Sequence, residues 1–373
     1  MALKIHILGT RGIPARYGGF ETAAEHLSVG LAAKGHEVTV YCPAYQSYRT
    51  SVYNGVHLRF VPNLEHRFKG RVARAICNLL YDIQSLFAAC FSRAEVIYML
   101  GYASGPFMIL PRLFGKKLVV NPDGLEWKST RWGPFARWWL HLCEGLSARC
   151  SNGLVGDAEP ISYRFRNVYN ANIVTIEYGT ELYVAPPEEV SEFPRESYYI
   201  AVARMVPETK VDVIIDGFRQ AALRNRILIV VGPVTDAHFF ETEILPRVDG
   251  DTVRYLGAIY DKSRLKSLRA NARALLHGHA SDGTNPSLLE SMGCASPVIS
   301  IDRASNVKVL TRGNALYFTD APTLSEALST FELKSDEARR DMGQRNYERV
   351  AGDFSWNAAV AAHERIFRSV CER

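Results

Sequence analysis

The stretch "LKIHILGTRGIPARYGGFE", residues 3–21, joins a short apolar run, a glycine-rich loop and the start of a helical pattern. The apolar run is rich in β-branched residues and ends at a glycine, so it predicts a buried strand. Glycines in a loop between a strand and a helix let the backbone approach a phosphate or a sugar. An ordinary turn explains Gly9 and Gly12 equally well, whereas Gly18 and Gly19, directly before the helix, favour a ligand.

The spacing of these glycines differs from that of two common phosphate-binding motifs. Neither the dinucleotide fingerprint G-x-G-x-x-G nor the P-loop pattern G-x-x-x-x-G-K-[ST] is present in the loop. The sequence therefore supports neither an NAD site nor a Walker-type nucleotide site.

The order of strand and then helix repeats along the whole chain. Short β-rich runs alternate with amphipathic stretches such as 21–34 and 73–92, which predicts mostly parallel sheets with helices on both faces. The alternation stops at "YVAPPEEVSEFPRES", 183–197, where three prolines and the lack of periodicity indicate a linker, and then restarts. A length of 373 residues also suits two domains. We therefore expect two Rossmann-like α/β domains in tandem, with an interdomain cleft.

The composition predicts a globular protein whose charge is unevenly distributed. Hydrophobic residues make up 47% of the chain, and no apolar run approaches the roughly 20 residues of a transmembrane helix. The seven scattered cysteines predict reduced thiols in a cytoplasmic protein, with neither disulfides nor a zinc site. Residues 1–190 hold 20 Lys and Arg against 15 Asp and Glu, whereas residues 191–373 hold 24 of each. This excess predicts an acidic partner for the first half: nucleic acid, an anionic membrane or a phosphorylated substrate.

Two acids separated by seven residues mark the second half, in "HGHASDGTNPSLLESMG", 277–293. Asn285 suits the N-cap of a helix and Pro286 its first position. Asp282 then lies in the loop before this helix, and Glu290 lies about one turn into it. Taken alone, the two acids would suit a solvated surface helix better than a site.

The loop between these acids predicts an anion site. The backbone amides of Gly283, Thr284 and Asn285 lie near the positive end of the helix. Carboxylates on either side of an anion can accept hydrogen bonds from sugar or ribose hydroxyls. A ligand that has a phosphate in the middle and a hydroxyl-bearing group on each side is a nucleotide sugar.

Two cations follow the first strand of the second half. Arg204 and Lys210, in "ARMVPETKVDVIIDGF", 203–218, stand after the carboxyl end of that strand, where open α/β sheets bind their ligands. A diphosphate at that position would meet both charges. The glycine loop, the cation pair and the acid pair together favour a nucleotide-sugar site over solvated surface charges.

Over nearly its whole length the chain resembles the retaining family 4 glycosyltransferases of the GT-B fold. Within that family it is most similar to bacterial rhamnosyltransferases that begin with "GTRGIPARYGGFE". Besides the acid motif, the resemblance is carried by "GHEVTVY" at 35–41, "NPDGLEWKSTRW" at 121–132 and "FSWNAAVAAHERIF" at 354–367.

The resemblance implies a division of the chain into two Rossmann-like domains that face each other across a cleft. Residues 1–190 would form the acceptor-side domain, and a C-terminal helix at about 354–373 would cross back onto it. Residues 191–353 would bind the nucleotide-sugar donor.

The resemblance also implies roles for individual residues. Glu290 would hold the donor ribose, and Asp282, which stands where the family usually has Glu, would face the donor sugar. Arg204 and Lys210 would neutralise the leaving diphosphate. Asp123 takes the place of a histidine that many relatives carry near the reacting carbon. The candidate catalytic residues are Asp123, Arg204, Lys210 and Asp282.

The remaining implied site residues are backbone donors and acceptor-side groups. The donor-binding set also includes Gly18, Gly19, Gly283, Thr284 and Asn285. The acceptor-side candidates are Arg16, Tyr17 and Glu126, with Arg11 also at the mouth of the site.

The implied reaction is transfer of L-rhamnose from dTDP-L-rhamnose, with retention, onto a lipid-diphosphate-linked saccharide during assembly of a surface polysaccharide. The resemblance implies neither a cofactor nor a metal ion. One alternative is a GT-B nucleotide-sugar epimerase, and another is a transferase that uses UDP-glucose or UDP-GlcNAc. A non-catalytic sugar-nucleotide sensor is disfavoured because the cations and Glu290 are retained.

Basic and aromatic residues in the first half predict docking to an anionic membrane. "EHRFKGRVARA", 65–75, holds four Lys and Arg, and "KSTRWGPFARWWLHL", 128–142, interleaves cations with Trp132, Phe135, Trp138 and Trp139. The alternative is that the tryptophans face a core. No nucleic-acid-binding motif is present. We therefore expect a cytoplasmic protein that is peripheral at the inner face of the cell membrane.

Overall fold

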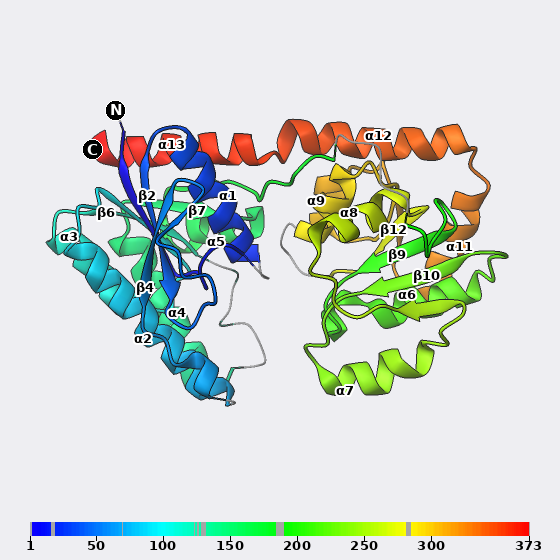
Figure 1. Cartoon of the computed structure of the whole chain (residues 1–373), viewed down its shortest axis with the longest axis horizontal. Coiled ribbons are helices and arrows are strands. Elements are labelled where there is room, and N and C mark those ends of the chain that lie inside the picture. The colour runs from blue at the N-terminus through cyan, green and yellow to red at the C-terminus, as the bar shows by residue number, and fades with distance from the viewer. Residues whose placement is uncertain are drawn as a thin grey trace. The chain divides into compact units, whose positions relative to one another are not determined.

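Two α/β units, each built on one sheet, make up the computed structural model of the chain (Figure 1). The first unit comprises Met1–Tyr178 and Trp356–Arg373, and the second comprises Gly179–Ser355. In the part of the chain that the structure describes, no helix combines the length and the apolar character needed to cross a membrane. The structure describes residues 2–15, 19–68, 70–122, 124, 127, 132–183, 190–280 and 285–372.

The first sheet has eight strands in the order β3-β4-β2-β1-β5-β6-β7-β8. The strands pair in parallel except for β3, which runs antiparallel to β4. They are β1 (Lys4–Leu8), β2 (Glu37–Pro43), β3 (Val52–Tyr53), β4 (Val56–Val61), β5 (Val96–Leu100), β6 (Lys117–Asn121), β7 (Gly153–Gly156) and β8 (Ile173–Thr175).

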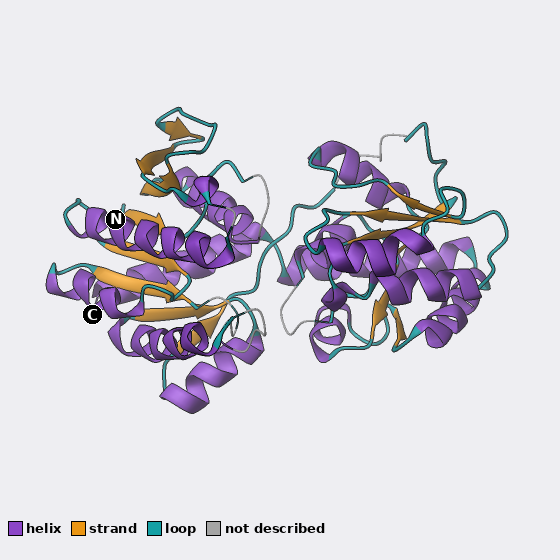
Figure 2. Cartoon of the chain, turned by 90° about the horizontal axis from the view of Figure 1, so that it is seen from below, coloured by secondary structure: helices purple, strands orange, loops and turns teal. Residues whose placement is uncertain are grey.

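Helices cover both faces of this sheet (Figure 2). Successive strand residues therefore enter different cores: Tyr98 packs in the core that contains α1 and α13, whereas Ile97 packs in the core that contains α2 and α5. This burial on both faces explains why the strands read as continuous apolar runs. The helices are α1 (Gly19–Ala33), α2 (Arg71–Cys90), α3 (Leu110–Leu113), α4 (Pro134–Cys150), α5 (Glu159–Tyr169) and α13 (Trp356–Glu372).

The C-terminal helix α13 packs against α1 of the first unit. The contact is close because a Cβ at Gly30 would lie 2.6 Å from a methyl group of Val360. An ion pair of 2.7 Å joins Lys34, directly after α1, to Glu364 in α13. The last helix of the chain is thus an integral part of the unit formed by its first half.

The second sheet has six parallel strands in the order β11-β10-β9-β12-β13-β14. Figure 1 shows α8 and α9 on one side of this sheet and α6 on the other. The strands are β9 (Tyr198–Val202), β10 (Ile227–Val231), β11 (Val253–Tyr255), β12 (Ala274–His277), β13 (Val298–Ile301) and β14 (Leu316–Phe318).

The helices of the second unit pack closely enough to require glycine at their contacts. A Cβ at Gly217 in α6 would lie 2.8 Å from the backbone oxygen of Ala321 in α11. In the same way, a Cβ at Gly343 in α12 would overlap the backbone oxygen of Ala295, which follows α9. The helices are α6 (Val211–Gln220), α7 (Ala237–Phe239), α8 (Lys262–Asn271), α9 (Pro286–Gly293), α10 (Ala304–Leu310), α11 (Ala321–Glu332) and α12 (Asp336–Asp353).

Candidate active site

The strand order of the second sheet reverses between β9 and β12. The chain leaves the carboxyl end of β9 for β10 on one side, while β12 pairs with the other side of β9. Open α/β sheets bind ligands outside the carboxyl ends of the strands at such a reversal. The predicted cation motif follows β9, and the predicted acid motif follows β12. The fold therefore brings together two motifs that lie far apart in the sequence.

The loop after β9 presents both predicted cations. The hydroxyl of Thr209 donates to the backbone oxygen of Arg204 at 2.9 Å and stabilises this loop. Arg204 is exposed, and Lys210 is half-buried at the N-cap of α6. Within the described residues neither side chain has an ion-pair partner, so both charges are available to an anion.

Lys210 adopts a left-handed backbone conformation, with φ of 52° and ψ of 34°. An L-residue with a Cβ pays roughly 1–2 kcal/mol for this conformation relative to the right-handed helix. Strained backbone of this kind often occurs at functional sites. The strain indicates that contacts with the surrounding residues hold the backbone of Lys210 in this conformation.

The segment after β12 packs directly against the cation loop. The backbone N–H of Ala280 donates to the oxygen of Glu208 at 3.0 Å. A Cβ at Gly278 would lie 2.5 Å from the backbone oxygen of Thr209 and 3.2 Å from the Cβ of Lys210. Glycine at 278 thus allows the two loops to meet, which the sequence alone did not reveal.

Two histidines near the end of β12 are held neutral. Burial lowers the pKa of His277 to about 3. Burial, followed by the charge of Arg204, lowers the pKa of His279 below its ordinary value. The hydrogen bond from Ala280 to Glu208 holds this segment against the loop that carries Arg204.

The start of α9 is capped as predicted. The side-chain oxygen of Asn285 accepts from the N–H of Ser287 at 2.9 Å and from that of Leu288 at 3.4 Å. The Asn285 carbonyl accepts from Leu288 and Leu289. Because Pro286 has no N–H, the first turn has no unused amide, and any backbone donors to an anion must precede the helix.

Glu290 of α9 forms an ion pair with Arg269 of α8. The distance from Arg269 Nη2 to Glu290 Oε2 is 2.6 Å, and 43% of the Glu290 side chain remains exposed. Arg269 carries no signal in the sequence that marks it as part of the site, because no spacing rule connects a residue of one helix with a residue of the next.

Gly19 is the first residue of α1, directly after the glycine loop. The following predictions lie outside the described residues: Arg16, Tyr17, Gly18, Asp123, Glu126, Asp282, Gly283 and Thr284.

The glycines at the start of the first unit have local structural reasons. Gly9 has a φ of 83°, and a Cβ there would overlap the backbone oxygen of Leu100 in β5. Gly12 has a φ of 88°, and a Cβ there would lie 2.4 Å from Gln46 Oε1. Both therefore serve the backbone packing of the loop, which is the alternative that the sequence left open.

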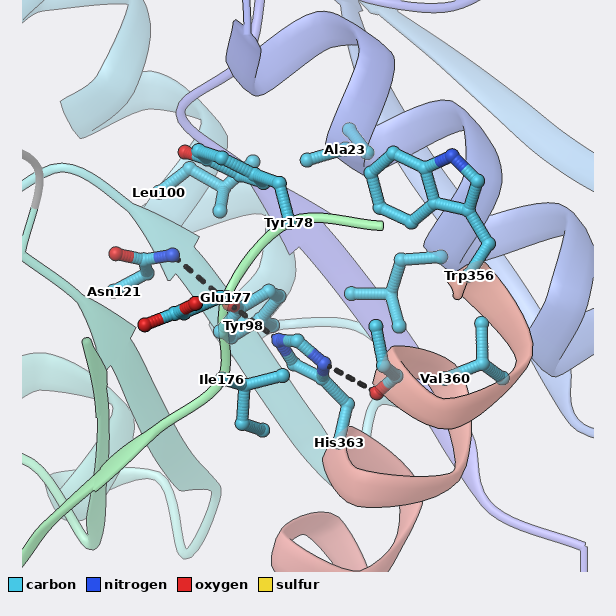
Figure 3. Close-up of a pocket in the computed structure, with 13 residues that line it drawn as sticks. Ala23, Tyr98, Leu100, Asn121, Ile176, Glu177, Tyr178, Trp356, Val360 and His363 are labelled. Atoms are coloured by element: carbon cyan, nitrogen blue, oxygen red, sulfur yellow. Dashed lines mark hydrogen bonds between the residues drawn. The ribbon is translucent and has the colours of Figure 1, made fainter. Parts of the chain in front are cut away.

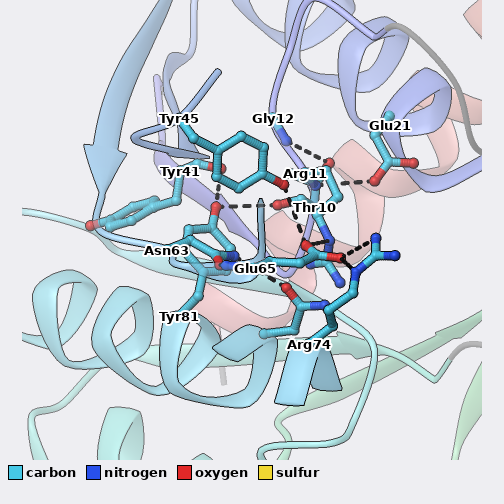
Figure 4. Close-up of polar contacts among 11 residues, drawn as sticks. Thr10, Arg11, Gly12, Glu21, Tyr41, Tyr45, Asn63, Glu65, Arg74 and Tyr81 are labelled. Carbon is cyan, nitrogen blue, oxygen red and sulfur yellow. Dashed lines mark hydrogen bonds and ion pairs between the residues drawn. The ribbon is translucent and has the colours of Figure 1, made fainter. Parts of the chain in front are cut away.

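Arg11, in the same loop, is surrounded by acids (Figure 4). Its Nε lies 3.4 Å from Glu65 Oε2, and its backbone N–H donates to Glu21 at 3.1 Å. Burial raises the pKa of Asp82 to about 7, while the nearby Arg11 opposes that shift. The charge of Arg11 is thus balanced inside the first unit, whereas the cations after β9 have no ion-pair partner in the described part of the chain.

A pocket in the first unit holds a polar group that sequence reasoning missed (Figure 3). The hydroxyl of Tyr98 in β5 donates to His363 Nε2 at 3.0 Å, because His363 Nδ1 donates to the Ala359 carbonyl. Asn121 Nδ2 donates to the Tyr98 oxygen at 3.4 Å. Asn121 Oδ1 is buried without a partner among the described residues, so it can accept from a ligand hydroxyl or from water.

Family comparisons cover nearly all of the chain in two parts. Residues 2–181 match a family described as "Domain of unknown function (DUF1972)". Residues 187–349 match the family "Glycosyl transferases group 1". No curated protein matches the chain in sequence.

Solved structures with the same fold extend over the full chain. Sucrose-phosphate synthase from Thermosynechococcus elongatus has a TM-score of 0.81 at 18% identity, over 99% of this chain and 99% of that chain. HepE of Anabaena in complex with UDP and glucose has a TM-score of 0.75 at 13% identity, over 98% of this chain and 100% of that chain. The predicted α/β class with two Rossmann-like domains is confirmed, and the fold is GT-B.

Proposed function

We propose that this chain, whose residues 187–349 belong to the glycosyl transferases group 1 family, transfers L-rhamnose from dTDP-L-rhamnose to a saccharide hydroxyl with retention. The observation that carries the proposal is a pair of cations, Arg204 and Lys210, beside the carboxyl end of β12 at the strand reversal. Neither has an ion-pair partner among the residues that the structure describes. The donor preference follows the sequence resemblance.

The chemistry requires stabilisation of a leaving diphosphate. The bond between the anomeric carbon and the phosphate oxygen breaks, and its electron pair goes to the diphosphate. The acceptor oxygen bonds to the same face of the carbon, and its proton passes to a phosphate oxygen. Arg204 and Lys210 stabilise the charge on that phosphate, which is a role that a divalent metal fills in other enzymes. In this proposal Asp282 contacts the donor sugar, and Asp123 acts near the reacting carbon in place of the histidine that many relatives carry.

The choice of donor is tested by thermal unfolding of the full chain with dTDP-L-rhamnose, UDP-glucose, UDP-GlcNAc and GDP-mannose. UDP-glucose is included because HepE of Anabaena has been crystallised with it. A donor at 100 times its Kd adds about 2.7 kcal/mol, which raises the transition of a unit of this size by about 5–10 °C. A rise in the unfolding temperature with dTDP-L-rhamnose alone supports the proposed donor. A rise only with a UDP-sugar would show that the donor is that UDP-sugar and not dTDP-L-rhamnose.

Product analysis distinguishes transfer from the alternatives. With donor and a lipid-diphosphate-linked saccharide, we expect a glycoside of the same anomeric configuration as the donor, formed equally well in EDTA. A new sugar isomer from donor alone would identify an epimerase. Donor binding without any conversion would identify a sensor.

We also propose that the first unit docks on an anionic membrane and receives the lipid-linked acceptor there. Apolar side chains on α2 repeat with helical spacing on its exposed side. Arg74 pairs with Glu65, and Trp139 donates to the Ala103 carbonyl, so these two belong to the unit itself rather than to the lipid contact. The exposed apolar residues are Val72, Ile76, Leu80 and Phe87 on α2, Phe91 directly after it, and Phe135 and Trp138 on α4.

Vesicle sedimentation tests this docking. The wild-type chain should pellet with vesicles of phosphatidylcholine and phosphatidylglycerol but much less with phosphatidylcholine alone. Ile76→Glu with Leu80→Glu should reduce the bound fraction at least about tenfold, since both side chains are about half exposed and lose their apolar contact. Leu333→Glu, at an exposed apolar residue of the second unit, is the matched control. Equal pelleting of the double variant and the control would refute the proposed surface.

A further inference from the structure

Arg269 is a buried cation next to the proposed donor site. Its side chain is 4% exposed, and its Nη2 contacts Glu290 Oε2 at 2.6 Å and Ser287 Oγ at 3.3 Å. A guanidinium is costly to bury unless charged and polar partners compensate it. Both partners of Arg269 are on α9, so its charge stabilises the contact between α8 and α9.

Ser287 extends this contact to the strand that precedes the cation loop. Its hydroxyl donates to the backbone oxygen of Val202, the last residue of β9, at 3.0 Å. A hydroxyl has one proton and two lone pairs, so it accepts from Arg269 while donating to Val202. One guanidinium therefore links α8, α9 and, through Ser287, the end of β9.

The same contact leaves half of the Glu290 carboxylate free. Oε2 is taken by Arg269, and no donor among the described residues reaches Oε1. With 43% of the side chain exposed, Oε1 is open to a ligand. A carboxylate fixed through one oxygen presents the other in a defined direction without losing side-chain freedom on binding.

We propose that Arg269 is a positioning residue for Glu290, holding its carboxylate so that Oε1 accepts from a hydroxyl of the pentose in the nucleoside diphosphate, which in dTDP is the 3′-hydroxyl of the deoxyribose. The inference rests on the proposed function, in which Glu290 binds the donor ribose. Loss of the guanidinium leaves Glu290 free to rotate and leaves Ser287 without its donor. Freezing one such side chain on binding corresponds to roughly a tenfold loss of affinity.

The test measures how much the ribose hydroxyl contributes to binding. The full chain is titrated calorimetrically with dTDP and 2′,3′-dideoxythymidine diphosphate, and with UDP and its 2′,3′-dideoxy form. In the wild type, removing the hydroxyls from the preferred nucleotide should weaken binding about tenfold. Arg269→Met and Glu290→Gln should each abolish most of that difference, and the double variant should be no worse than either single variant.

Further variants separate positioning from a general loss of structure. Arg269→Lys keeps the charge in the same place and should restore part of the hydroxyl dependence. Arg219→Met, which removes an exposed ion pair with Asp249 in the same unit, should leave it unchanged. In the transfer assay Arg269→Met should raise KM for the donor with little change in kcat, because ribose binding is equally strong in the ground and transition states.

The outcomes are separable. If Glu290→Gln abolishes the hydroxyl dependence and Arg269→Met retains it in full, the positioning role is wrong while the proposed function stands. The positioning role is also wrong if the wild type binds the nucleotide equally tightly with and without its pentose hydroxyls. If the wild type binds neither nucleotide, the proposed function fails, and this inference fails with it.

Discussion

Replacing Arg204 with alanine is expected to lower kcat about a thousandfold while the protein stays folded. The guanidinium is exposed, has no ion-pair partner among the described residues, and follows the carboxyl end of β9. In the proposed reaction it stabilises charge that develops on the leaving diphosphate, and removing one such group typically costs about 10²–10³ in rate. The measurement is a single-turnover assay with saturating donor, alongside thermal unfolding.

The stability of this variant should remain close to that of the wild type. An exposed side chain without a partner contributes about 0.5 kcal/mol or less. Arg224→Ala is the matched control, because Arg224 is exposed and lies three residues before β10, at the amino ends of the strands. Turnover at the control rate in Arg204→Ala would remove Arg204 from the mechanism.

A titration gives a second readout of the same variant. The charge of Arg204 contributes to the lowered pKa of His279. Without the guanidinium, the pKa of His279 should move upward toward its ordinary value, although burial still depresses it. An NMR titration of the histidine follows this shift without any substrate.

The sequence predicts local features of the site well because they depend on neighbours in the chain. The cap at Asn285 and the proline after it follow from the preferences of the first helical turn, and α9 begins where they place it. Arg204 and Lys210 likewise follow a strand that its apolar run identifies. The role of each in binding stays a prediction.

Features that depend on the pairing of distant segments could not be predicted. The reversal between β9 and β12 is a matter of strand order, which no local pattern encodes. Arg269 meets Glu290 across two helices, and Tyr98 meets His363 at the other end of the chain. The glycines at 9 and 12 illustrate the same limit, since the atoms that exclude a side chain belong to β5 and to the loop after β2.

Lys210 allows the charge and the backbone of the site to be tested separately. Lys210→Met removes the ammonium but keeps a long apolar stem and the left-handed backbone at φ of 52°. Lys210→Gly removes the ammonium and also the Cβ that opposes this backbone conformation. We expect both variants to lose about a hundredfold in kcat, because both lack the second cation at the diphosphate.

The two variants should differ in stability, with Lys210→Gly the more stable. This is the reverse of the usual effect, because glycine substitutions ordinarily destabilise a protein. Glycine adopts positive φ at little steric cost, but it also raises the conformational entropy of the unfolded chain. With both effects counted, the free energy of unfolding of Lys210→Gly should exceed that of the wild type by about 0.5–1 kcal/mol. The free energy of unfolding of Lys210→Met should match that of the wild type. Urea unfolding of the three proteins measures the difference. A glycine variant that is less stable than the methionine variant would contradict the strained backbone, and wild-type turnover by either would show that the diphosphate does not meet this lysine. If the glycine variant is both more stable and inactive, as expected, then the chain keeps a strained lysine at 210 for the charge that it carries.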